Sequence, residues 1–372
     1  MALAKSNSAT PHNSRLLRDI LVNGTLALLC VIWLVPLLGL FISSFRERAD
    51  IAQSGWWTVF PHQAYISVDK IQLTRGIPLD QPVQVGELTL SDTQLRAGFV
   101  APDGLRYIWA NRRARLVDVQ QQQWMANTNL TTENYSNVLL GQTYTYTQSD
   151  GSTKSEKGED MSRAFINSLT VTIPATVIPI LLAAFAAYAF AWMRFPGRRP
   201  LFAMVVGLLV IPGQVALIPI LRAFSVIDIN GTLLALWLVH TGFGLSLSIY
   251  LLYNYISSLP REILESAFID GATPFTIFMR LILPLSVPAL ASFAIFQFMW
   301  VWNDYLNALI FLGSTPETQV VTIKLAQMIG SRGQDWHLLT AGGFVTMLLP
   351  LVVFFSLQRF FVRGLLAGSV KG

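Results

Sequence analysis

Long apolar segments alternate with short polar connections along most of the chain. Six of the apolar segments are long enough to cross about 30 Å of hydrocarbon at about 1.5 Å per residue. We therefore predict an all-α polytopic membrane protein whose spans are residues 20–44, 165–193, 201–221, 231–253, 287–312 and 339–361. The first span is too long for a signal peptide and no small-residue cleavage site follows it, so we expect it to be retained.

One long polar region, residues 45–163, interrupts this pattern between the first and second spans. Within it, short runs alternate apolar and polar residues and are separated by proline or glycine, which is typical of strands. The alternating apolar positions are Ile66 and Val68, Val83 and Val85, Leu88 and Leu90, Leu105, Tyr107 and Trp109, and Val117 and Val119. The sequence predicts a β-rich insertion domain. We interpret its basic cluster, Arg112, Arg113 and Arg115, as a solvated strand edge, with a docking surface as the alternative.

Composition agrees with a membrane protein, because 53% of the 372 residues are hydrophobic and only 13% are charged. A mean hydropathy of +0.50 is too high for a soluble chain of this length. The net charge of +5 does not indicate a nucleic-acid partner, since the basic residues are scattered at segment ends. Cys30 is the only cysteine, which excludes an intrachain disulfide.

The basic residues also predict an orientation in the membrane. One set of connections and tails carries Arg194, Arg198, Arg199, Arg261, Arg280, Arg359, Arg363 and Lys371. The short loops on the other side carry only Arg222, Lys324 and Arg332. By the positive-inside rule, we expect cytoplasmic tails at residues 1–19 and 362–372 and a periplasmic insertion. The predicted location is the bacterial inner membrane, and residues 164–361 form a five-helix core.

A helix, a tight turn and a second helix are predicted within the cytoplasmic segment 258–284. Ser258 and Pro260 suit a helix start, and Gly271 suits the end of that helix. Thr273 with Pro274 suits a second start, and Pro284 kinks or stops the second helix. The first arm carries three acids, Glu262, Glu265 and Asp270, while the second is almost wholly apolar. Taken alone, this pattern also fits an amphipathic helix in the lipid interface.

Polar residues within spans are costly, so they are candidates for function. We place Asn303, Asp304 and Gln214 on a possible substrate path. Asp304 fits equally well as a partner of a neighbouring helix or a group that reaches external water. Gln214, beside Pro212, fits as a donor to carbonyls that the proline leaves unpaired. We interpret His240 as a hydrogen-bonded packing residue.

Motifs for catalysis are absent from the sequence. It contains no G-x-x-x-x-G-K-[ST], H-E-x-x-H or G-x-S-x-G motif. We therefore expect no enzyme in this polypeptide. If ATP drives transport, the ATPase must be a separate subunit.

The cytoplasmic segment resembles the EAA loop of the membrane subunits of ABC importers. The resemblance rests on Glu265-Ser266-Ala267, then Gly271, then Leu281-Ile282-Leu283-Pro284, with Ser266 and Leu281 as mild departures from the usual residues. It implies the type I ABC importer fold and a loop that docks on the ATPase, with Glu265 as an anionic anchor. The implied coupling residues are Glu265, Ser266, Ala267, Asp270, Gly271, Leu283 and Pro284.

Further stretches are similar to the carbohydrate-uptake branch of that family, the maltose-type G permeases. They are Asn134-Tyr135, Asn167-Ser168-Leu169, Trp302-Asn303-Asp304 and the tail 364–372, and the insertion after Gly55-Trp56-Trp57 looks most like that of α-glucoside permeases. The resemblance implies oligosaccharide import by alternating access. The implied partners are a second permease subunit, two ATPase subunits that hold ATP and Mg, a periplasmic sugar-binding protein and membrane lipid. No cofactor is expected on this chain.

Two alternatives remain open at this stage. A permease of the same type for a polyamine or glycerol phosphate would share the cytoplasmic segment. A secondary carrier would need no ATPase, but it would be expected to show inverted repeats or a carboxylate relay, and Asp304 is the only obvious acid within a span.

Overall fold

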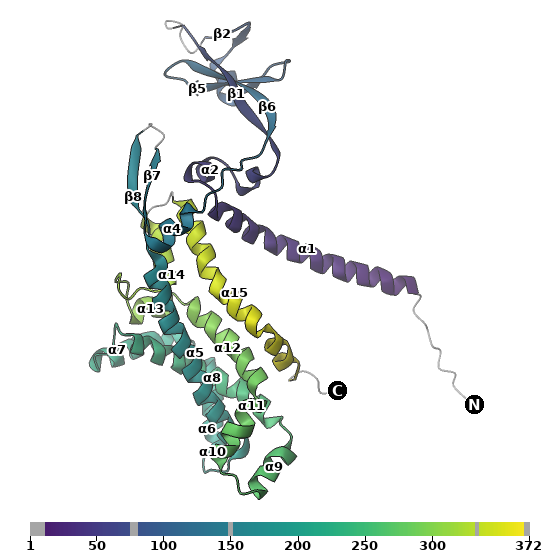
Figure 1. The fold of residues 1–372 in the computed structure, drawn as a ribbon, viewed down its shortest axis with the longest axis vertical. Coiled ribbons are helices and arrows are strands. Elements are labelled where there is room, and N and C mark those ends of the chain that lie inside the picture. Colours follow the sequence, from purple (N-terminus) through teal and green to yellow (C-terminus); the bar gives the residue numbers. More distant parts are fainter. Residues whose placement is uncertain (1–11, 75–80, 148–151, 332–334, 368–372) are drawn as a thin grey trace, which may run out of the picture. The chain divides into compact units, whose positions relative to one another are not determined.

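The chain divides into two compact units in the computed structural model, which describes residues 12–74, 81–147, 152–331 and 335–367 (Figure 1). The first unit comprises residues 1–42 and 49–131, and the second comprises residues 43–48 and 132–372. The predicted insertion boundary at residue 163 therefore differs from the division at residue 131. The difference arises because Val138 and Tyr144 pack with Met161 and Leu338 of the helical unit.

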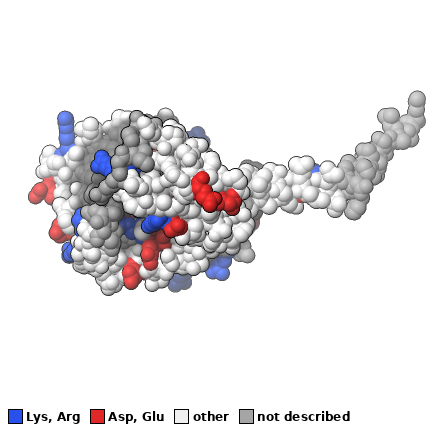
Figure 2. Space-filling model, turned by 90° about the horizontal axis from the view of Figure 1, so that it is seen from above, with Lys and Arg blue, Asp and Glu red and all other residues white. Residues whose placement is uncertain are grey.

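Helix α1, His12–Ser44, contains the first predicted span and begins earlier than residue 20. Within its apolar part, Leu16–Ser44, an 18-residue stretch has a mean hydropathy of 2.6, yet only 6% of that stretch is buried. Figure 2 shows the almost uncharged surface of this helix as a white rod. Apolar surface of this extent is stable only against lipid or another protein.

The rest of the first unit is β-rich, as predicted. An antiparallel sheet has the order β1-β6-β5-β4, and its strands are His62–Gln72, Leu116–Met125, Leu105–Asn111 and Phe99–Val100. A hairpin of β2, Val83–Val85, and β3, Leu88–Leu90, leads into helix α3, Asp92–Ala97. Their buried side chains form one small core: Leu73, Val83, Val85, Leu90, Leu95 and Val117. Short helices α2, Arg48–Gln53, and η1, Trp56–Val59, precede the sheet.

The interpretation of the basic cluster as a strand edge was wrong, because the cluster lies at the turn between β5 and β6. The Arg112 guanidinium donates to the Asp92 carboxylate at 2.8 Å, and Arg96 contacts the same carboxylate at 2.9 Å. The hydrogen bond from Arg112 lowers the pKa of Asp92. The Arg115 side chain donates to the Thr74 carbonyl at 3.1 Å. These arginines therefore hold the turn against α3 and β1.

The second unit is a bundle built on four long helices: α5, Met161–Trp192, α8, Leu233–Ser257, α12, Val287–Trp302, and α15, Trp336–Ala367. Helix α5 packs along α8, and α12 packs along α15 (Figure 1). Helix α4, Glu133–Leu140, the hairpin of β7, Thr143–Thr147, and β8, Thr153–Lys157, and helix α14, Val321–Ser331, belong to the same unit. In the described part of the chain, four helices could span a membrane, namely α1, α5, α8 and α15, or up to six spans if two bent pairs count.

One bent pair breaks within a predicted span, 201–221, and the other joins residues 274–285 to α12 at 72°. Residues 198–210, which include α6, Arg198–Gly207, and η2, Leu208–Val210, meet α7, Gly213–Val226, at 104°. Proline disfavours a helical conformation in the residue before it, and Ile211 is extended just before Pro212. Separately from these bends, the predicted span 287–312 ends early, because α12 stops at Trp302 and a short helix α13, Leu306–Phe311, follows.

Segment 43–48 is held in the second unit by α4. The buried Asn134 side chain donates to the carbonyls of Ser44 and Arg46 at 3.0 and 2.9 Å, and the Tyr135 hydroxyl contacts the Ser44 hydroxyl at 2.6 Å. Arg48 pairs with Asp335 at 3.1 Å and stacks over the Tyr146 ring at 3.6 Å. Since buried carbonyls need donors, Asn134 fixes segment 43–48 against α4.

We predict that Asn134→Ala lowers the free energy of unfolding by about 2 kcal/mol, because two buried carbonyls lose their donor. Thermal unfolding of the purified protein in detergent should then shift down by about 5 °C. Asn129→Ala is the matched control, since that side chain is exposed. Equal melting temperatures for the two variants would contradict the role of Asn134 as the donor that holds segment 43–48.

Candidate functional site

Segment 258–284 forms a helical hairpin, as predicted. Helix α9, Arg261–Ile269, is followed by a turn and by helix α10, Pro274–Ile277. The Ala272 amide donates to the Ala267 carbonyl at 3.0 Å and the Gly271 amide to the Phe268 carbonyl at 3.1 Å. Gly271 has a φ of +76°, which a side chain disfavours. These two bonds and the glycine form a Schellman motif that ends α9 and reverses the chain.

The starts of the two arms differ in how far they match the prediction. Pro260 is the residue before α9, whereas Ser258 instead ends α8. The second start is as predicted: the Thr273 hydroxyl accepts from the Thr276 amide at 3.2 Å, and Pro274 occupies the first turn. Each arm is therefore fixed at its end before any partner binds.

A π-helical segment, η3, Phe278–Ile282, continues the second arm into helix α11, Leu283–Leu285. Pro284 has no amide hydrogen and its ring excludes the carbonyl four residues earlier, which accounts for the widened turn. The arm then meets α12 at an angle of 72°. Leu283 and Pro284 thus lie where the hairpin joins the span that follows it.

The inner face of the hairpin belongs to the core of the bundle. Leu264, Ile277 and Ile282 are at most 1% exposed, and they share a cluster with Tyr188 of α5 and Leu252 of α8. Burying three such side chains stabilises the contact by about 5–8 kcal/mol before entropy losses. The hairpin is therefore packed on the spans and is not a free loop.

The outer face of the hairpin combines acids with exposed apolar side chains. Glu262, Glu265 and Asp270 are exposed, and in the described part of the chain the Glu265 carboxylate has no ion pair. Ile269 is 85% exposed and Phe275 is 65% exposed, one on each side of the Gly271 turn. Sequence reasoning missed both, although two large apolar residues beside a glycine turn were a usable signal. Such a surface suits a protein partner that carries a cation and an apolar pocket.

The remaining predicted coupling residues lie in the same arm or turn. Ser266 is exposed and its hydroxyl donates to the Ile263 carbonyl at 3.0 Å, within α9. Ala267 is half-buried, and its carbonyl accepts the bond that closes the turn. Asp270 ends α9. The structure therefore brings Glu265 to Gly271 together and separates them from Leu283 and Pro284 by the second arm.

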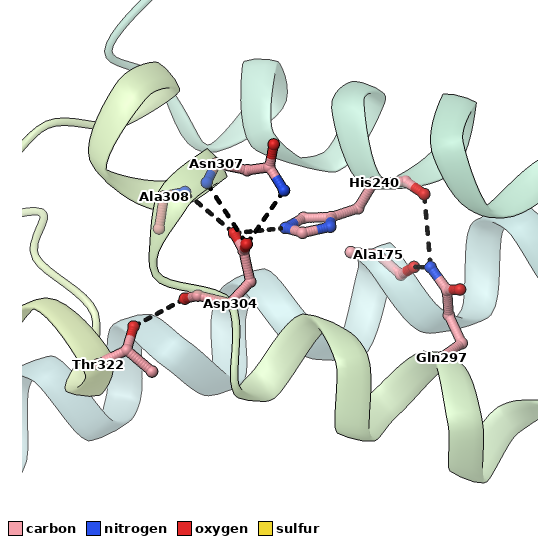
Figure 3. A network of polar contacts seen from close by, with 7 residues as sticks. All are labelled: Ala175, His240, Gln297, Asp304, Asn307, Ala308 and Thr322. Carbon is pink, nitrogen blue, oxygen red and sulfur yellow. Dashed lines mark hydrogen bonds and ion pairs between the residues drawn. The ribbon is translucent and has the colours of Figure 1, made fainter. Parts of the chain in front are cut away.

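Asp304 lies in a polar network where the fifth predicted span breaks (Figure 3). Its carboxylate accepts from the Asn307 and Ala308 amides, at 3.4 and 3.0 Å, and from the Asn307 side chain at 3.0 Å. The same carboxylate lies 3.5 Å from Nε2 of the buried His240 in α8. The Asp304 carbonyl accepts from the Thr322 hydroxyl at 2.7 Å. Asp304 thus caps α13 and joins it to α8 and α14.

Gln297 forms a second part of this network and was missed from the sequence. It is 2% exposed, and its side chain donates to the Ala175 carbonyl at 3.1 Å and to the His240 carbonyl at 3.4 Å (Figure 3). A Cβ on Gly244 would lie 2.7 Å from the Gln297 amide oxygen, so the glycine makes room for it. The sequence did offer a signal for this contact, because Gln297 is a polar residue within an otherwise apolar run.

The predicted substrate-path residues do not form one site. Asn303 is exposed and its side chain donates to the Met299 carbonyl at 2.8 Å, within its own helix. Gln214 is exposed on α7 and forms no hydrogen bond within the described residues, so the idea that it satisfies kink carbonyls finds no support. The cavity beside Asp304 and His240 has a volume of about 10 Å³. That volume suits about one water and no sugar.

The sequence of this chain is similar to a family of membrane transport proteins and to named permeases. Residues 166–366 match the family described as the inner membrane component of binding-protein-dependent transport systems. The osmoprotective compounds uptake permease protein GgtD of Synechocystis sp. is 44% identical and covers 100% of this chain and 99% of its own length. The alpha-glucoside transport system permease protein AglG of Rhizobium meliloti is also 44% identical, over 94% of this chain and 97% of its own length.

The fold is similar to that of a chain in a bacterial ABC transporter involved in the import of the acidic polysaccharide alginate. The TM-score is 0.62 at 15% identity, and the match covers 97% of this chain and 100% of that chain. This likeness supports the predicted type I importer fold. With residues 166–366 matched to the family and full-length relatives at 44% identity, the chain belongs to the inner membrane permease components of binding-protein-dependent ABC importers.

Proposed function

We propose that this chain moves an α-glucoside or a similar oligosaccharide across the inner membrane, driven by ATP hydrolysis in a separate subunit. The observation that carries the ATP-driven part is the helical hairpin, whose inner face packs on α5 and α8 while its outer face presents acids and exposed apolar side chains. The solute class is suggested by relatives named for alpha-glucoside and for melibiose, raffinose and stachyose.

Coupling follows from the rigidity of the hairpin. A cation on the ATPase would pair with Glu265, and Ile269 and Phe275 would enter apolar pockets beside it. When two ATPase subunits close on ATP and Mg, they move the docked hairpin as one body with the ends of α5 and α8. The binding site then opens alternately to the two sides of the membrane. This chain holds no cofactor in the scheme.

The proposed assembly contains a second permease subunit, two ATPase subunits and a periplasmic sugar-binding protein. Both termini and the hairpin face the cytoplasm, which follows from the excess of arginine in those connections. The β-rich part of the first unit then faces the periplasm, where it is placed to guide the binding protein. The exposed apolar surface of α1 supports lipid or the second permease subunit as its neighbour.

Asn303 and Gln214 stay candidates for the substrate path, since both are exposed polar residues on broken spans. Asp304 acts on the path indirectly in this proposal, by fixing the short helix α13 against α8. A polyamine, glycerol phosphate or other solute would use the same coupling hairpin. An osmoprotective compound is the second candidate solute, because the relative GgtD is named for such compounds.

Exchange of Glu265 for alanine should weaken ATPase binding about 10- to 150-fold, because a charge-assisted hydrogen bond contributes about 1.5–3 kcal/mol. Gly271→Pro should abolish coupling, since proline cannot adopt a φ of +76° or donate the turn hydrogen bond. Pull-down of the ATPase and ATP-driven uptake into vesicles measure both effects. Glu317→Ala is the control: it removes an exposed acid from the loop before α14 and should change neither ATPase binding nor ATP-driven uptake. Uptake without any ATPase would instead favour a secondary carrier.

The Asp304 network separates a structural role from a substrate contact. Asp304→Ala should lower the melting temperature, because a lost cap costs about 1–2 kcal/mol. Asp304→Asn should lower the melting temperature less than Asp304→Ala, since it keeps one of the two oxygens that accept from the first turn of α13. Melting curves and uptake kinetics of the two variants test this. A raised KM in both variants with unchanged melting would place Asp304 in direct contact with the solute.

The solute class can be measured in vesicles that contain the complete transporter. Radiolabelled sucrose and maltose, which are both α-glucosides, should be taken up only with ATP and the cognate binding protein. Spermidine, glycerol 3-phosphate and glycine betaine are the comparison solutes. Uptake of one of these three, without uptake of either sugar, would contradict the carbohydrate assignment while leaving the ATP-coupled hairpin intact.

A further inference from the structure

A cavity of about 660 Å³ lies where α5 ends and α6 begins. The chain turns there through Gly197, whose φ is +78°, before the first turn of α6. Nine residues line the cavity: Phe190, Arg194, Phe195, Gly197, Arg198, Arg199, Pro200, Phe202 and Tyr253. Three are arginines and none is acidic, so the lining carries a net positive charge.

Only one of the three arginines is used by the fold. Arg198 donates to the carbonyls of Met193 and Ala191, at 3.2 and 3.1 Å, and so caps the end of α5. Arg194 and Arg199 are exposed, and neither forms a hydrogen bond or an ion pair with any residue that the structure describes. Two guanidinium groups are therefore available to an anion beside a third that is fixed.

The wall of the cavity is aromatic and apolar. The rings of Phe202 and Tyr253 lie 4.3 Å apart, and the ring of Phe190 lies 5.3 Å from that of Phe202. The neighbouring part of the chain also exposes apolar side chains, with Met204 of α6 58% and Leu208 of η2 47% exposed. A molecule bound here would meet arginines at one end and apolar surface at the other.

The position along the helices matches the level of lipid headgroups. The apolar span of α5 ends at Trp192, two residues before Arg194, and α6 starts the next apolar pair of helices. Arginines at such a boundary lie near the phosphates of the membrane, and basic pockets between spans bind anionic headgroups.

We propose that this cavity binds the phosphate headgroup of an anionic phospholipid. Arg194 and Arg199 clamp the phosphate oxygens, since the planar guanidinium matches phosphate in a bidentate manner. The acyl chains lie along the exposed apolar face of α6. An ATPase surface fits less well, because it would leave that apolar face uncovered. The inference does not depend on which solute the transporter moves.

Binding at this cavity would act on the coupling hairpin. Phe190, Phe202 and Tyr253 belong to the same hydrophobic cluster as Leu264 and Ile277 of the hairpin, at the same end of the bundle (Figure 1). A lipid that fixes the first three side chains also stiffens the base on which the hairpin packs. Anionic lipid should therefore favour tight coupling.

Native mass spectrometry of the full transporter complex tests the site, with dioleoyl phosphatidylglycerol as the probe and dioleoyl phosphatidylcholine as the neutral comparison. Each juxtamembrane arginine contributes about fivefold to binding of an anionic lipid, so Arg194→Gln with Arg199→Gln should weaken phosphatidylglycerol binding about 25-fold. Binding of phosphatidylcholine should not change. Arg198 is left intact because it caps α5.

Arg222→Gln is the control, because it removes an exposed arginine from α7, outside the cavity. This variant should bind phosphatidylglycerol as tightly as the wild type does. Excess inorganic phosphate should not displace the lipid from the wild type. The proposal is overturned if the double variant retains wild-type binding, or if the control loses as much. Displacement of the lipid by inorganic phosphate would assign the cavity to the free anion. Loss of the ATPase from the double variant, with lipid binding intact, would make the surface an ATPase contact.

Discussion

The burial of one face of the helical hairpin, 258–284, is the contact on which the rest of the bundle's proposed movement depends. Leu264, Ile277 and Ile282 are almost fully buried against α5 and α8. A helix of nine residues is too short to be stable alone in water, so α9 persists because of this packing and its capped end. The same contact makes the hairpin part of the spans, which a coupling element needs in order to transmit movement.

A second constraint comes from the polar groups within the bundle. Breaks in the helices leave amides and carbonyls that lipid cannot satisfy. Asp304 supplies acceptors for the start of α13, and Gln297 supplies a donor to two carbonyls of α5 and α8. Asp304, which first suggested a substrate path, therefore holds a broken helix in place. Functional residues at the path have to be sought among exposed polar positions such as Asn303.

Hydropathy and capping signals were enough to predict the long helices α1, α5, α8 and α15 and the hairpin. The turn could be read from Gly271, and the second arm from Thr273 with Pro274, because each residue acts within its own turn of chain. The bend at Ile211 was not predicted, since a proline within an apolar run fits both a kink and a break. Contacts of Gln297 and Asn134 join segments far apart in sequence, and no local pattern reports them.

The movement of the hairpin relative to the spans tests the central claim most directly. Spin labels on cysteines at Ile269 in the hairpin and Leu234 at the far end of α8 would be separated by about 35 Å or more, judged from the length of α8. Cys30, the only native cysteine, is first replaced by serine. In the assembled transporter, we expect the distance between the two spin labels to be the same with and without ATP. A shift of about 5 Å or more on adding ATP, equal to a turn of helix, would show that the hairpin moves independently of the spans.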